Sequence, residues 1–511
     1  MNTENKLRVC VPVCASTITA VKEALAHACA VADIVELRLD CLLPAELERV
    51  TELQPLLASL EIPVIVTLRP CEQGGSSEFD LATRSRFWTS WSGSDLFYDL
   101  ELDLLEVGQW PKKTKSHHLI CSHHDFSKVP SNLEAIYDRM VATPARTIKL
   151  AVHAQDVTDC IPMFQLLARA RQQQREMIPI AMGPAGLATR ILGPARGAFL
   201  TYAALDQKSA TATGQPTVSE LKTLYRIDTI NQETEITGLI GLPLMHSVSP
   251  QMHNAALGAA GVNGVYIPFP VHDVGAFIAR MVHPRTREID WNIRGLSVTA
   301  PYKSTVMDAL DWIEPTAADL GAINTIVVDG NQLRGYNTDI LAFIQTLVAS
   351  FGELPNSTCA VIGAGGAARA VIWGLKQTAT NVTVFGRSEV QAKTLARELD
   401  VDSRPFVDAQ FGEFDLVINA TTLGTAGELE SQTPAGAEQL SGARLACDLV
   451  YNPEETLFLR EARKAGCSTL GGLPMLVQQA SEQFKLWTGK EAPAQVMSQA
   501  AQQALKALSG D

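Results

Sequence analysis

One group of residues in the first half of the chain could do chemistry on a carbonyl compound. Lys149 stands in the apolar stretch "TIKLAV", where burial and cationic neighbours should lower its pKa and leave it partly a neutral amine. Desolvated lysines of this kind form Schiff bases with ketones. The segment "SHHDF" offers His123 and His124 as proton carriers, although we interpret His123 as bracing a loop. A carboxylate could be held by the bidentate donors of Arg38, Arg69 and Arg190. The combination predicts imine-assisted elimination or aldol chemistry on a small keto acid.

A second group of candidate residues follows "TGLIGLPLMHSVSP", which ends a strand at Gly241 and begins a helix near Ser249. Ser247 and Ser249 could direct their hydroxyls at an anion bound at the helix N-terminus. An ordinary helix cap explains the same serines, and the residues alone favour it. Lys303 and Asp339 are candidates for an acid/base pair, because a lysine beside a carboxylate can pass a proton to a developing alkoxide. Their spacing does not require them to meet, so a surface lysine and a helix-capping aspartate are the alternative.

The segment "CAVIGAGGAARAVIWGL" predicts a dinucleotide site. A strand passes directly into a glycine-rich turn and then into an apolar helix, the arrangement that cradles phosphates, through Gly363, Ala364, Gly365, Gly366 and Ala367. The next strand, "NVTVFGRS", ends in Arg387 and Ser388, where an NAD enzyme usually carries an acidic residue for the ribose 2′-hydroxyl. Because an arginine suits a 2′-phosphate, the sequence favours NADP over NAD.

Alternating strands and helices must position the first group. Eight strand–helix units in roughly 220 residues predict a (β/α)₈ barrel, whose usual length is about 250 residues. In the strand "VELRLD", from Val35 to Asp40, apolar residues alternate with charged ones. In a barrel the apolar face packs on helices, so Glu36, Arg38 and Asp40 should face inward near the C-terminal mouth. The same alternation places Thr67, Arg69 and Lys149 inward.

Composition and charge narrow the class of protein. The 511 residues exceed one ordinary core and predict two or three domains. With 46% hydrophobic and 19% charged residues, the chain is typical of a soluble globular enzyme. A net charge of -13 argues against bulk binding of nucleic acid or anionic membranes. Neither a signal peptide nor a membrane-spanning apolar run is recognisable. The ten cysteines are scattered without CxxC pairs, which favours reduced thiols in the cytoplasm over disulfides or a bound metal.

The first part of the chain resembles type I 3-dehydroquinate dehydratases. "ELRLD", "TLRPCEQGG", "SHHDF", "IKLAV", "MGPAGLATR" and "ATATGQ" occur in the family's order, up to about residue 222. The resemblance implies Lys149 as the Schiff-base lysine and His124 as the general acid/base. It also implies a set of substrate contacts: Glu36, Arg38, Arg69, Arg190, Thr211 and Gln215. The implied reaction is imine formation, abstraction of the neighbouring proton, loss of water, and hydrolysis to 3-dehydroshikimate.

Two residues depart from the family pattern. Gln73 stands where the family usually has the glutamate that supports the charged histidine, so His124 should titrate lower here. Thr213 stands where proline is common before "GQ", which should affect only the stiffness of a closing loop.

The remainder resembles shikimate dehydrogenase from residue 236 to about 508, through "GLPLMHSVSP", "SVTAPYK", "AINT", "NTD", "GAGGAAR", "NAT", "DLVYNP" and "GGLPMLVQQA". The resemblance implies Lys303 and Asp339 as the catalytic pair. The ring of the substrate would be lined by Ser247, Ser249, Thr299, Asn324, Tyr451 and Gln479. NADP would contact Gly363, Ala364, Gly365, Gly366, Ala367, Arg387 and Ser388, with Thr421 and Gly472 nearby. Ser297 stands where many bacterial members have asparagine.

Together the two resemblances identify the chain as similar to fused dehydratase–dehydrogenases. The expected α/β fold is a barrel over residues 1–228, followed by an open substrate lobe (236–340), a Rossmann NADP lobe (341–472) and returning C-terminal helices (473–511). We expect small-molecule partners, namely 3-dehydroquinate, 3-dehydroshikimate and shikimate, with no metal, and a monomer or small homo-oligomer. An NAD-linked quinate dehydrogenase is the nearest alternative for the second half. A barrel that binds without catalysing is the alternative for the first, and Gln73 is the feature that keeps it open.

Overall fold

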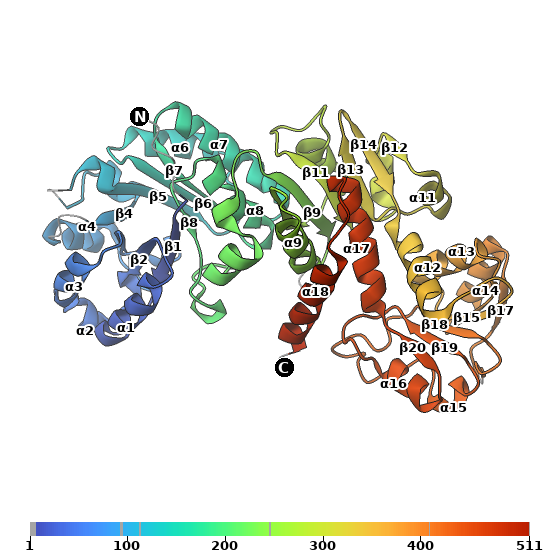
Figure 1. Ribbon diagram of the computed structural model, residues 1–511. Coiled ribbons are helices and arrows are strands. Elements are labelled where there is room, and N and C mark those ends of the chain that lie inside the picture. The colour runs from blue at the N-terminus through green and yellow to red at the C-terminus, as the bar shows by residue number, and fades with distance from the viewer. Residues whose placement is uncertain (1–6, 92–95, 112–113, 245–246, 408, 510–511) are drawn as a thin grey trace. The chain divides into compact units, whose positions relative to one another are not determined.

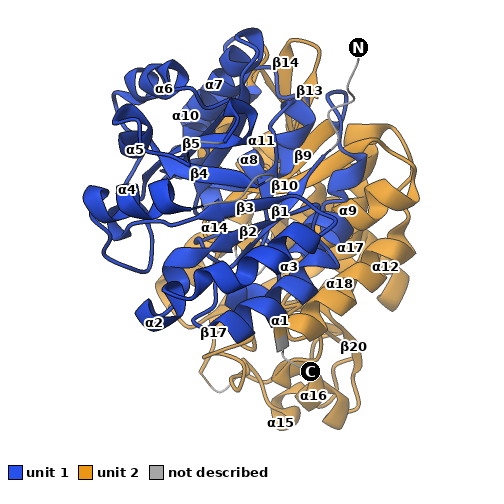
Figure 2. Ribbon diagram, turned by 90° about the vertical axis from the view of Figure 1, so that its left-hand side faces the viewer, with its two compact units in different colours: residues 1–234, 269–282, 286–292 blue, residues 235–268, 283–285, 293–511 orange. Residues whose placement is uncertain are grey.

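The first eight strands of the computed structural model form one parallel sheet that is nearly closed into a barrel (Figure 1). The structure describes residues 7–91, 96–111, 114–244, 247–407 and 409–509. It contains two compact units, coloured separately in Figure 2. The barrel unit comprises residues 1–234, 269–282 and 286–292, and the second unit comprises residues 235–268, 283–285 and 293–511.

Each barrel strand pairs with its neighbour in sequence, in the order β7-β6-β5-β4-β3-β2-β1-β8. Beside β7, the amide of Phe199 donates to the carbonyl of Met177 at 2.8 Å, which brings the last segment against the seventh strand. All eight predicted strands are confirmed. They are β1 (Val9–Val13), β2 (Ile34–Arg38), β3 (Val64–Thr67), β4 (Phe97–Glu101), β5 (Leu119–Asp125), β6 (Thr147–His153), β7 (Glu176–Met182) and β8 (Thr201–Tyr202).

The interior of the barrel is apolar at its lower end and charged at its mouth. Cys10, Ile34, Ile65, Ile120 and Ile178 pack together in one cluster. Two residues after Ile34, Ile65 and Ile120, where the side chain returns to the same face, stand the polar or charged residues Glu36, Thr67 and Ser122. The inward alternation expected from "VELRLD" is therefore confirmed for Glu36, which is buried within the barrel.

Amphipathic helices link the barrel strands. The first, α1 (Ile18–Cys29), is capped by Thr17, whose hydroxyl accepts from the amide of Ala20, and buries the face that carries Val21 and Leu25. The other linking helices are α2 (Pro44–Leu47), α3 (Gln54–Ser59), α4 (Leu81–Ser90), α5 (Leu102–Glu106), α6 (Leu133–Ala142), α7 (Cys160–Gln172) and α8 (Leu187–Leu192). The barrel unit also contains α10 (Val274–Phe277), which comes later in the chain and links no barrel strands.

The second unit begins with a mixed sheet in the order β10-β9-β11-β13-β14-β12. Its strands are β9 (Glu235–Gly241), β10 (Gly264–Pro270), β11 (Ile293–Val298), β12 (Trp312–Ile313), β13 (Thr325–Asp329) and β14 (Gln332–Tyr336). Its helices are α9 (Ser249–Ala259), α11 (Pro315–Leu320) and α12 (Thr338–Phe351). The predicted strand end at Gly241 and helix start at Ser249 are confirmed.

A second, fully parallel sheet in the order β17-β16-β15-β18-β19-β20 forms the Rossmann lobe. Its elements are β15 (Thr358–Ile362), α13 (Gly366–Lys376), β16 (Asn381–Gly386), α14 (Glu389–Leu399), β17 (Asp402–Pro405), β18 (Leu416–Asn419), α15 (Ala437–Leu440), β19 (Leu445–Asp448), α16 (Leu457–Lys464) and β20 (Ser468–Leu470). The final helices then pack on earlier ones, α17 (Gly472–Thr488) on α12 and α18 (Ala494–Ser509) on α9.

The cysteine prediction is wrong for one pair, because Cys14 and Cys41 form a disulfide with 5.4 Å between their Cα atoms. The two residues lie 27 positions apart but follow neighbouring strands, a proximity that sequence spacing does not reveal. The other eight cysteines are free.

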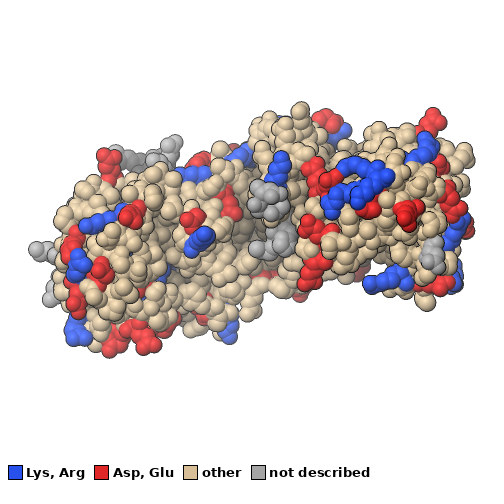
Figure 3. All heavy atoms as spheres, turned by 90° about the horizontal axis from the view of Figure 1, so that it is seen from below, with Lys and Arg blue, Asp and Glu red and all other residues tan. Residues whose placement is uncertain are grey.

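None of the described helices is long and apolar enough to cross a membrane. Within the same residues, no cluster of three or more histidine, cysteine or acidic side chains could hold a metal ion. Figure 3 shows basic and acidic side chains interspersed over the face that it draws.

Two candidate active sites

Lys149 lies inside the barrel on β6, with about 5% of its surface exposed. Its ammonium donates to Asp99 Oδ2 at 2.7 Å, to the Tyr202 hydroxyl at 2.9 Å and to Glu36 Oε1 at 3.3 Å. The expectation of cationic neighbours is therefore wrong for these direct contacts, which include two carboxylates. Two carboxylates and a phenol, from three other strands, converge on one amine, as a site for nucleophilic chemistry requires.

His124 lies on the barrel face of β5 and is held by Gln73. Gln73 Oε1 accepts from the backbone amide of His124 at 2.8 Å and lies 3.3 Å from its Nδ1. A proton on Nδ1 is thereby held by the amide oxygen, which leaves Nε2 for a substrate. Burial sets the pKa of His124 well below its usual range, and the positive charges of Arg69 and Lys149 act in the same direction. The neutral imidazole is suited to act as a base.

The guanidinium of Arg69 contacts three side chains of the barrel. Its Nη1 lies 2.6 Å from both Glu101 Oε1 and Ser122 Oγ, and its Nη2 lies 2.7 Å from Asp99 Oδ1. Burial alone would raise the pKa of Asp99, but Arg69 and Lys149 hold it well below its usual range. Asp99 thus remains ionised and joins the arginine to the lysine.

Arg38 forms an ion pair, whereas Arg190 has no ion-pair partner among the described residues. Arg38 donates from Nε and Nη2 to the two oxygens of Asp40, at 2.9 and 2.7 Å. Arg190, on α8, is about 2% exposed, and its Nη1 donates to the carbonyl of Tyr202 over a long distance of 3.4 Å. Its Nε has no hydrogen-bond partner within the described part of the chain. Of the three predicted arginines, Arg190 therefore offers the least occupied guanidinium to a substrate carboxylate.

Thr211 and Gln215 lie together in the loop after β8. The amide and hydroxyl of Thr211 both donate to Gln215 Oε1, at 2.9 and 3.2 Å. The carbonyl of Thr213 accepts from Gly183, just beyond β7, at 3.0 Å. Gly214 has φ +70°, and a Cβ there would come within 2.5 Å of the Gly183 backbone, so glycine permits this close approach.

The second unit contains a cavity of about 880 Å³. All eight residues predicted for the substrate and its proton transfer line it: Ser247, Ser249, Thr299, Lys303, Asn324, Asp339, Tyr451 and Gln479. They come from separate elements, because Ser249 begins α9, Lys303 follows β11, Asp339 lies in the first turn of α12 and Gln479 lies on α17. The fold therefore gathers residues that sequence spacing alone could not bring together.

Lys303 Nζ donates to Asp339 Oδ2 at 2.6 Å, so the two predicted partners meet. The helix cap is not Asp339 but Asn337, whose side chain accepts from the amides of Asp339 and Ile340. This leaves the carboxylate of Asp339 for the lysine and excludes the helix-capping alternative.

The dinucleotide residues lie at the carboxyl edge of the parallel sheet. Gly363 follows β15, Arg387 and Ser388 follow β16, and Thr421 follows β18. Gly366, Ala367 and Gly472 also line the cavity. A Cβ on Gly363 would meet the carbonyl oxygen of Ala420 at 2.8 Å, whereas one on Gly365 or Gly366 would meet open space. The room in front of the first turn of α13 fits a pyrophosphate approaching the helix N-terminus.

Comparisons with known proteins agree with both sites. The family model for type I 3-dehydroquinase matches residues 9–232. Models for the shikimate dehydrogenase substrate binding domain, for shikimate / quinate 5-dehydrogenase and for the shikimate 5'-dehydrogenase C-terminal domain match residues 239–326, 346–439 and 472–502. The bifunctional 3-dehydroquinate dehydratase/shikimate dehydrogenase of Arabidopsis thaliana, named as chloroplastic, is 32% identical over 96% of this chain and 83% of its own length. This chain belongs to that family of bifunctional enzymes.

Two further relatives concern the dehydrogenase unit. The NADP(+) shikimate dehydrogenase of Desulforamulus reducens is 40% identical over 52% of this chain and 94% of its own length. A crystal structure of shikimate dehydrogenase in complex with NADP+ is 34% identical, with a TM-score of 0.50, over 54% of this chain and 97% of the other. The barrel unit is therefore a 3-dehydroquinate dehydratase, and the second unit is an NADP-dependent shikimate dehydrogenase.

Sequence reasoning missed several residues of both sites. Asp99 and Tyr202 contact Lys149 in the dehydratase, and the alternation in "FYDLE" would have placed Asp99 inward had it been applied there. In the dehydrogenase, Gln483 also lines the cavity. Its Oε1 accepts from Ser297, which in turn accepts from the Tyr266 hydroxyl, each at 2.8 Å. Gln483 lies one helical turn after Gln479, and that spacing was its available signal.

Proposed function

We propose that the dehydratase acts through an imine on Lys149 and that the dehydrogenase transfers a proton through Lys303 and Asp339. The observation that carries the proposal is the pairing of each lysine with a carboxylate inside its site, Lys149 with Asp99 at 2.7 Å and Lys303 with Asp339 at 2.6 Å. Together they would convert 3-dehydroquinate to 3-dehydroshikimate and then to shikimate.

In the dehydratase, Lys149 must lose a proton before its nitrogen attacks the ketone carbon. Glu36, Asp99 and Tyr202 are within hydrogen-bond distance of that nitrogen and are the groups through which the proton can leave. Loss of water then gives the imine, which acidifies the neighbouring C–H. His124, neutral because of its burial, removes this proton through Nε2 and returns it to the departing hydroxyl. Hydrolysis of the imine restores the lysine.

Arg190 is the proposed anchor for the substrate carboxylate in the dehydratase. Burial lowers the pKa of its guanidinium to about 10, so the group is still positively charged at neutral pH. A bidentate carboxylate would supply the anionic partner that Arg190 does not have among the described residues. Arg38 and Arg69 would instead order the mouth around the substrate through Asp40, Asp99 and Glu101.

In the dehydrogenase, NADPH supplies the hydride when bound. Lys303 would donate a hydrogen bond and then a proton to the carbonyl oxygen, while Asp339 holds the ammonium in place. Asn324 is fixed for a substrate hydroxyl by Thr338, which its amide contacts at 2.9 Å. The hydroxyls of Ser247 and Ser249 would bind the substrate carboxylate at the start of α9.

Two further assignments remain proposals. The boundaries expected at residues 228, 236, 340 and 472 describe the four functional segments. A cytoplasmic location is supported by the eight free cysteines, which suit a reducing compartment.

The test adds 3-dehydroquinate to the full-length protein with NADPH and no other enzyme, and follows NADPH absorbance. Steady oxidation of NADPH is expected.

Two variants separate the two sites. Lys149→Ala should oxidise NADPH when given 3-dehydroshikimate but not when given 3-dehydroquinate, and borohydride should trap substrate on the wild-type Lys149 only. Asp339→Asn should accumulate 3-dehydroshikimate without oxidising NADPH. Dehydration by Lys149→Ala, or absence of a trapped imine in a wild type that dehydrates its substrate, would refute the covalent mechanism. Absence of dehydration by the wild type would favour a barrel that only binds.

A further inference from the structure

The disulfide between Cys14 and Cys41 lies at the mouth of the dehydratase. Cys14 directly follows β1, and Cys41 ends the short helical turn η1 (Leu39–Cys41) that follows β2. Since β1 and β2 are adjacent and parallel, both sulfurs come to the barrel end where the strands carry Glu36 and Lys149. Cys14 is exposed and Cys41 is half-buried, so the bond is open to thiols in solution.

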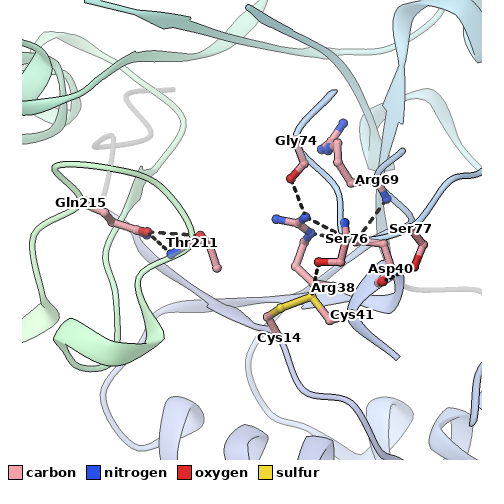
Figure 4. The surroundings of a disulfide bond; sticks show 10 residues. All are labelled: Cys14, Arg38, Asp40, Cys41, Arg69, Gly74, Ser76, Ser77, Thr211 and Gln215. Atoms are coloured by element: carbon pink, nitrogen blue, oxygen red, sulfur yellow. Dashed lines mark hydrogen bonds and ion pairs between the residues drawn. A yellow bond between two sulfur atoms is a disulfide. The ribbon is translucent and has the colours of Figure 1, made fainter. Parts of the chain in front are cut away.

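Asp40, beside the disulfide, connects it to the residues of the site (Figure 4). Its carboxylate binds both donors of Arg38 and accepts from the backbone amides of Arg69 and Ser76, at 3.2 and 3.1 Å. Its carbonyl accepts from the Ser77 hydroxyl at 2.9 Å. Asp40 is about 1% exposed, so these contacts are shielded from water. Asp40, the residue before Cys41, thus holds Arg38 directly. It also orders the loop that follows Arg69.

The loop over residues 70–77 carries this connection to His124. Arg38 Nη2 donates to the carbonyl of Gly74 at 3.3 Å, and Cys41 Sγ lies 3.8 Å from Ser76 Oγ. Gln73, in the same loop, accepts from the backbone amide of His124. A displacement of Cys41 would therefore be transmitted through Asp40 and this loop to the general base.

We propose that Cys14 and Cys41 form a reversible redox switch for the dehydratase, which rests on the proposed roles of Arg38 and His124. Two thiols of a reductant, such as glutathione or a protein dithiol, give two electrons and two protons to the disulfide. They leave as a new disulfide, while Cys14 and Cys41 become thiols. The reduced segment 39–43 is then held to the loop after β1 by non-covalent contacts, such as the bond from the Leu43 amide to the Ser16 carbonyl at 3.0 Å.

Reduction loosens the mouth without unfolding the barrel. Asp40 keeps its charge but loses its fixed position, so Arg38 and the 70–77 loop no longer hold one arrangement. The expected result is a fall of about tenfold in kcat/KM for 3-dehydroquinate, because small misplacements of positioning groups have effects of this size or larger. The dehydrogenase has no part in this network, so its activity should be unchanged.

The experiment equilibrates the full-length protein in mixtures of reduced and oxidised dithiothreitol. Dehydration is measured from the absorbance of 3-dehydroshikimate without NADPH, and reduction of added 3-dehydroshikimate serves as the internal control. Alkylation and mass spectrometry report the state of Cys14 and Cys41. Dehydratase activity should change with the same midpoint as the disulfide. Cys14→Ser and Cys41→Ser should stay at the reduced level of activity in every mixture, whereas Cys71→Ser, which removes an exposed thiol of the 70–77 loop, should switch as the wild type does.

Constant dehydratase activity across the range in which the disulfide converts would overturn the switch. So would a wild-type pair that stays reduced in the most oxidising mixture, or a response abolished by Cys71→Ser. These readings come from the wild type and Cys71→Ser, so they hold even if a Cys14 or Cys41 variant folds poorly. Absence of dehydration in every mixture would instead refute the dehydratase assignment, and the switch with it.

Discussion

Lys149 Nζ lies 2.7 Å from Asp99 Oδ2, and the other oxygen of Asp99 lies 2.7 Å from Arg69. One buried carboxylate thus balances the positive charges of the proposed Schiff-base lysine and of an arginine at the mouth. Removing one member of such a group leaves charges buried without a partner, which costs about 3–5 kcal/mol. Asp99 therefore fixes the charges of the dehydratase site, although it forms no bond to the substrate in the proposed mechanism.

Asp99→Asn should therefore lower the dehydratase kcat by about a hundredfold, equivalent to about 2.7 kcal/mol of transition-state stabilisation. The asparagine keeps the shape of the side chain but not the charge that fixes Lys149 and Arg69. Initial rates of 3-dehydroshikimate formation measure the loss, and the dehydrogenase rate checks the fold. Asp103→Asn removes a more exposed carboxylate that pairs with Arg84 at 2.7 Å and should have little effect. Equal losses in both variants would contradict the special role of Asp99.

Gln73→Glu should shift the pH dependence of dehydration. A carboxylate beside His124 would favour the imidazolium, and an opposite charge at this distance raises a pKa by about one unit or more. Since the neutral imidazole is the base in the proposed mechanism, activity should fall as pH drops through the pKa of His124. The acid limb of kcat/KM, which the depressed pKa of His124 places at low pH in the wild type, should therefore move to higher pH.

The control for this shift is Glu72→Gln. Glu72 is the neighbouring residue, with an exposed side chain 3.8 Å from Arg84. Its replacement changes the charge of the same loop without touching the imidazole. Identical acid limbs in wild type and Gln73→Glu would show that His124 does not titrate as the base.

The strands and helices could be predicted from the sequence, but the side-chain contacts between them could not. The period-two alternation places Glu36 inside the barrel, because side-chain direction is a local property of a strand. The pairing of Asp99 with Lys149 depends on the register of three neighbouring strands, β4, β5 and β6, and the disulfide depends on two loops meeting at the mouth. Lys303 and Asp339 were identified by residue type and resemblance, but their 2.6 Å contact arises only when the loop after β11 meets the first turn of α12. Arg387 was reasoned from its place after the second nucleotide strand, and its contact with a phosphate is still a prediction.

Arg387→Asp should weaken the binding of NADPH but not that of NADH. A charge-assisted hydrogen bond to the 2′-phosphate is worth about 1.5–3 kcal/mol, so KM for NADPH should rise at least tenfold, whereas KM for NADH should change little. Initial rates with 3-dehydroshikimate measure both. Arg404→Asp is the matched control, since Arg404 is another arginine of the Rossmann lobe, on β17. An equal rise for NADH and NADPH would remove Arg387 from the phosphate site.

His253 should make the dehydrogenase less stable in acid. Its ring stacks on Tyr266 with 4.3 Å between centroids, it is about 1% exposed, and neither ring nitrogen has a hydrogen-bond partner within the described residues. Burial lowers the pKa of His253 from 6.5 to about 3. Between these two values the unfolded chain binds a proton that the folded chain does not. Stability is therefore complete above about pH 6.5 and declines as pH falls towards 3, by at most about 1.4 kcal/mol per pH unit.

His253→Phe keeps the stacked ring and removes the titrating nitrogens, so it should lose less stability on acidification than the wild type does. Urea unfolding at pH 6.5 and pH 5.0 gives the free energy of unfolding for each protein, and the quantity of interest is the difference between the two pH values. We expect that difference to be smaller in the variant by about 1–2 kcal/mol. His117→Phe removes an exposed imidazole and should leave the difference as in the wild type. Because other acidic groups titrate equally in all three proteins, a difference that is unchanged in His253→Phe would mean that His253 is already accessible to protons in the folded state.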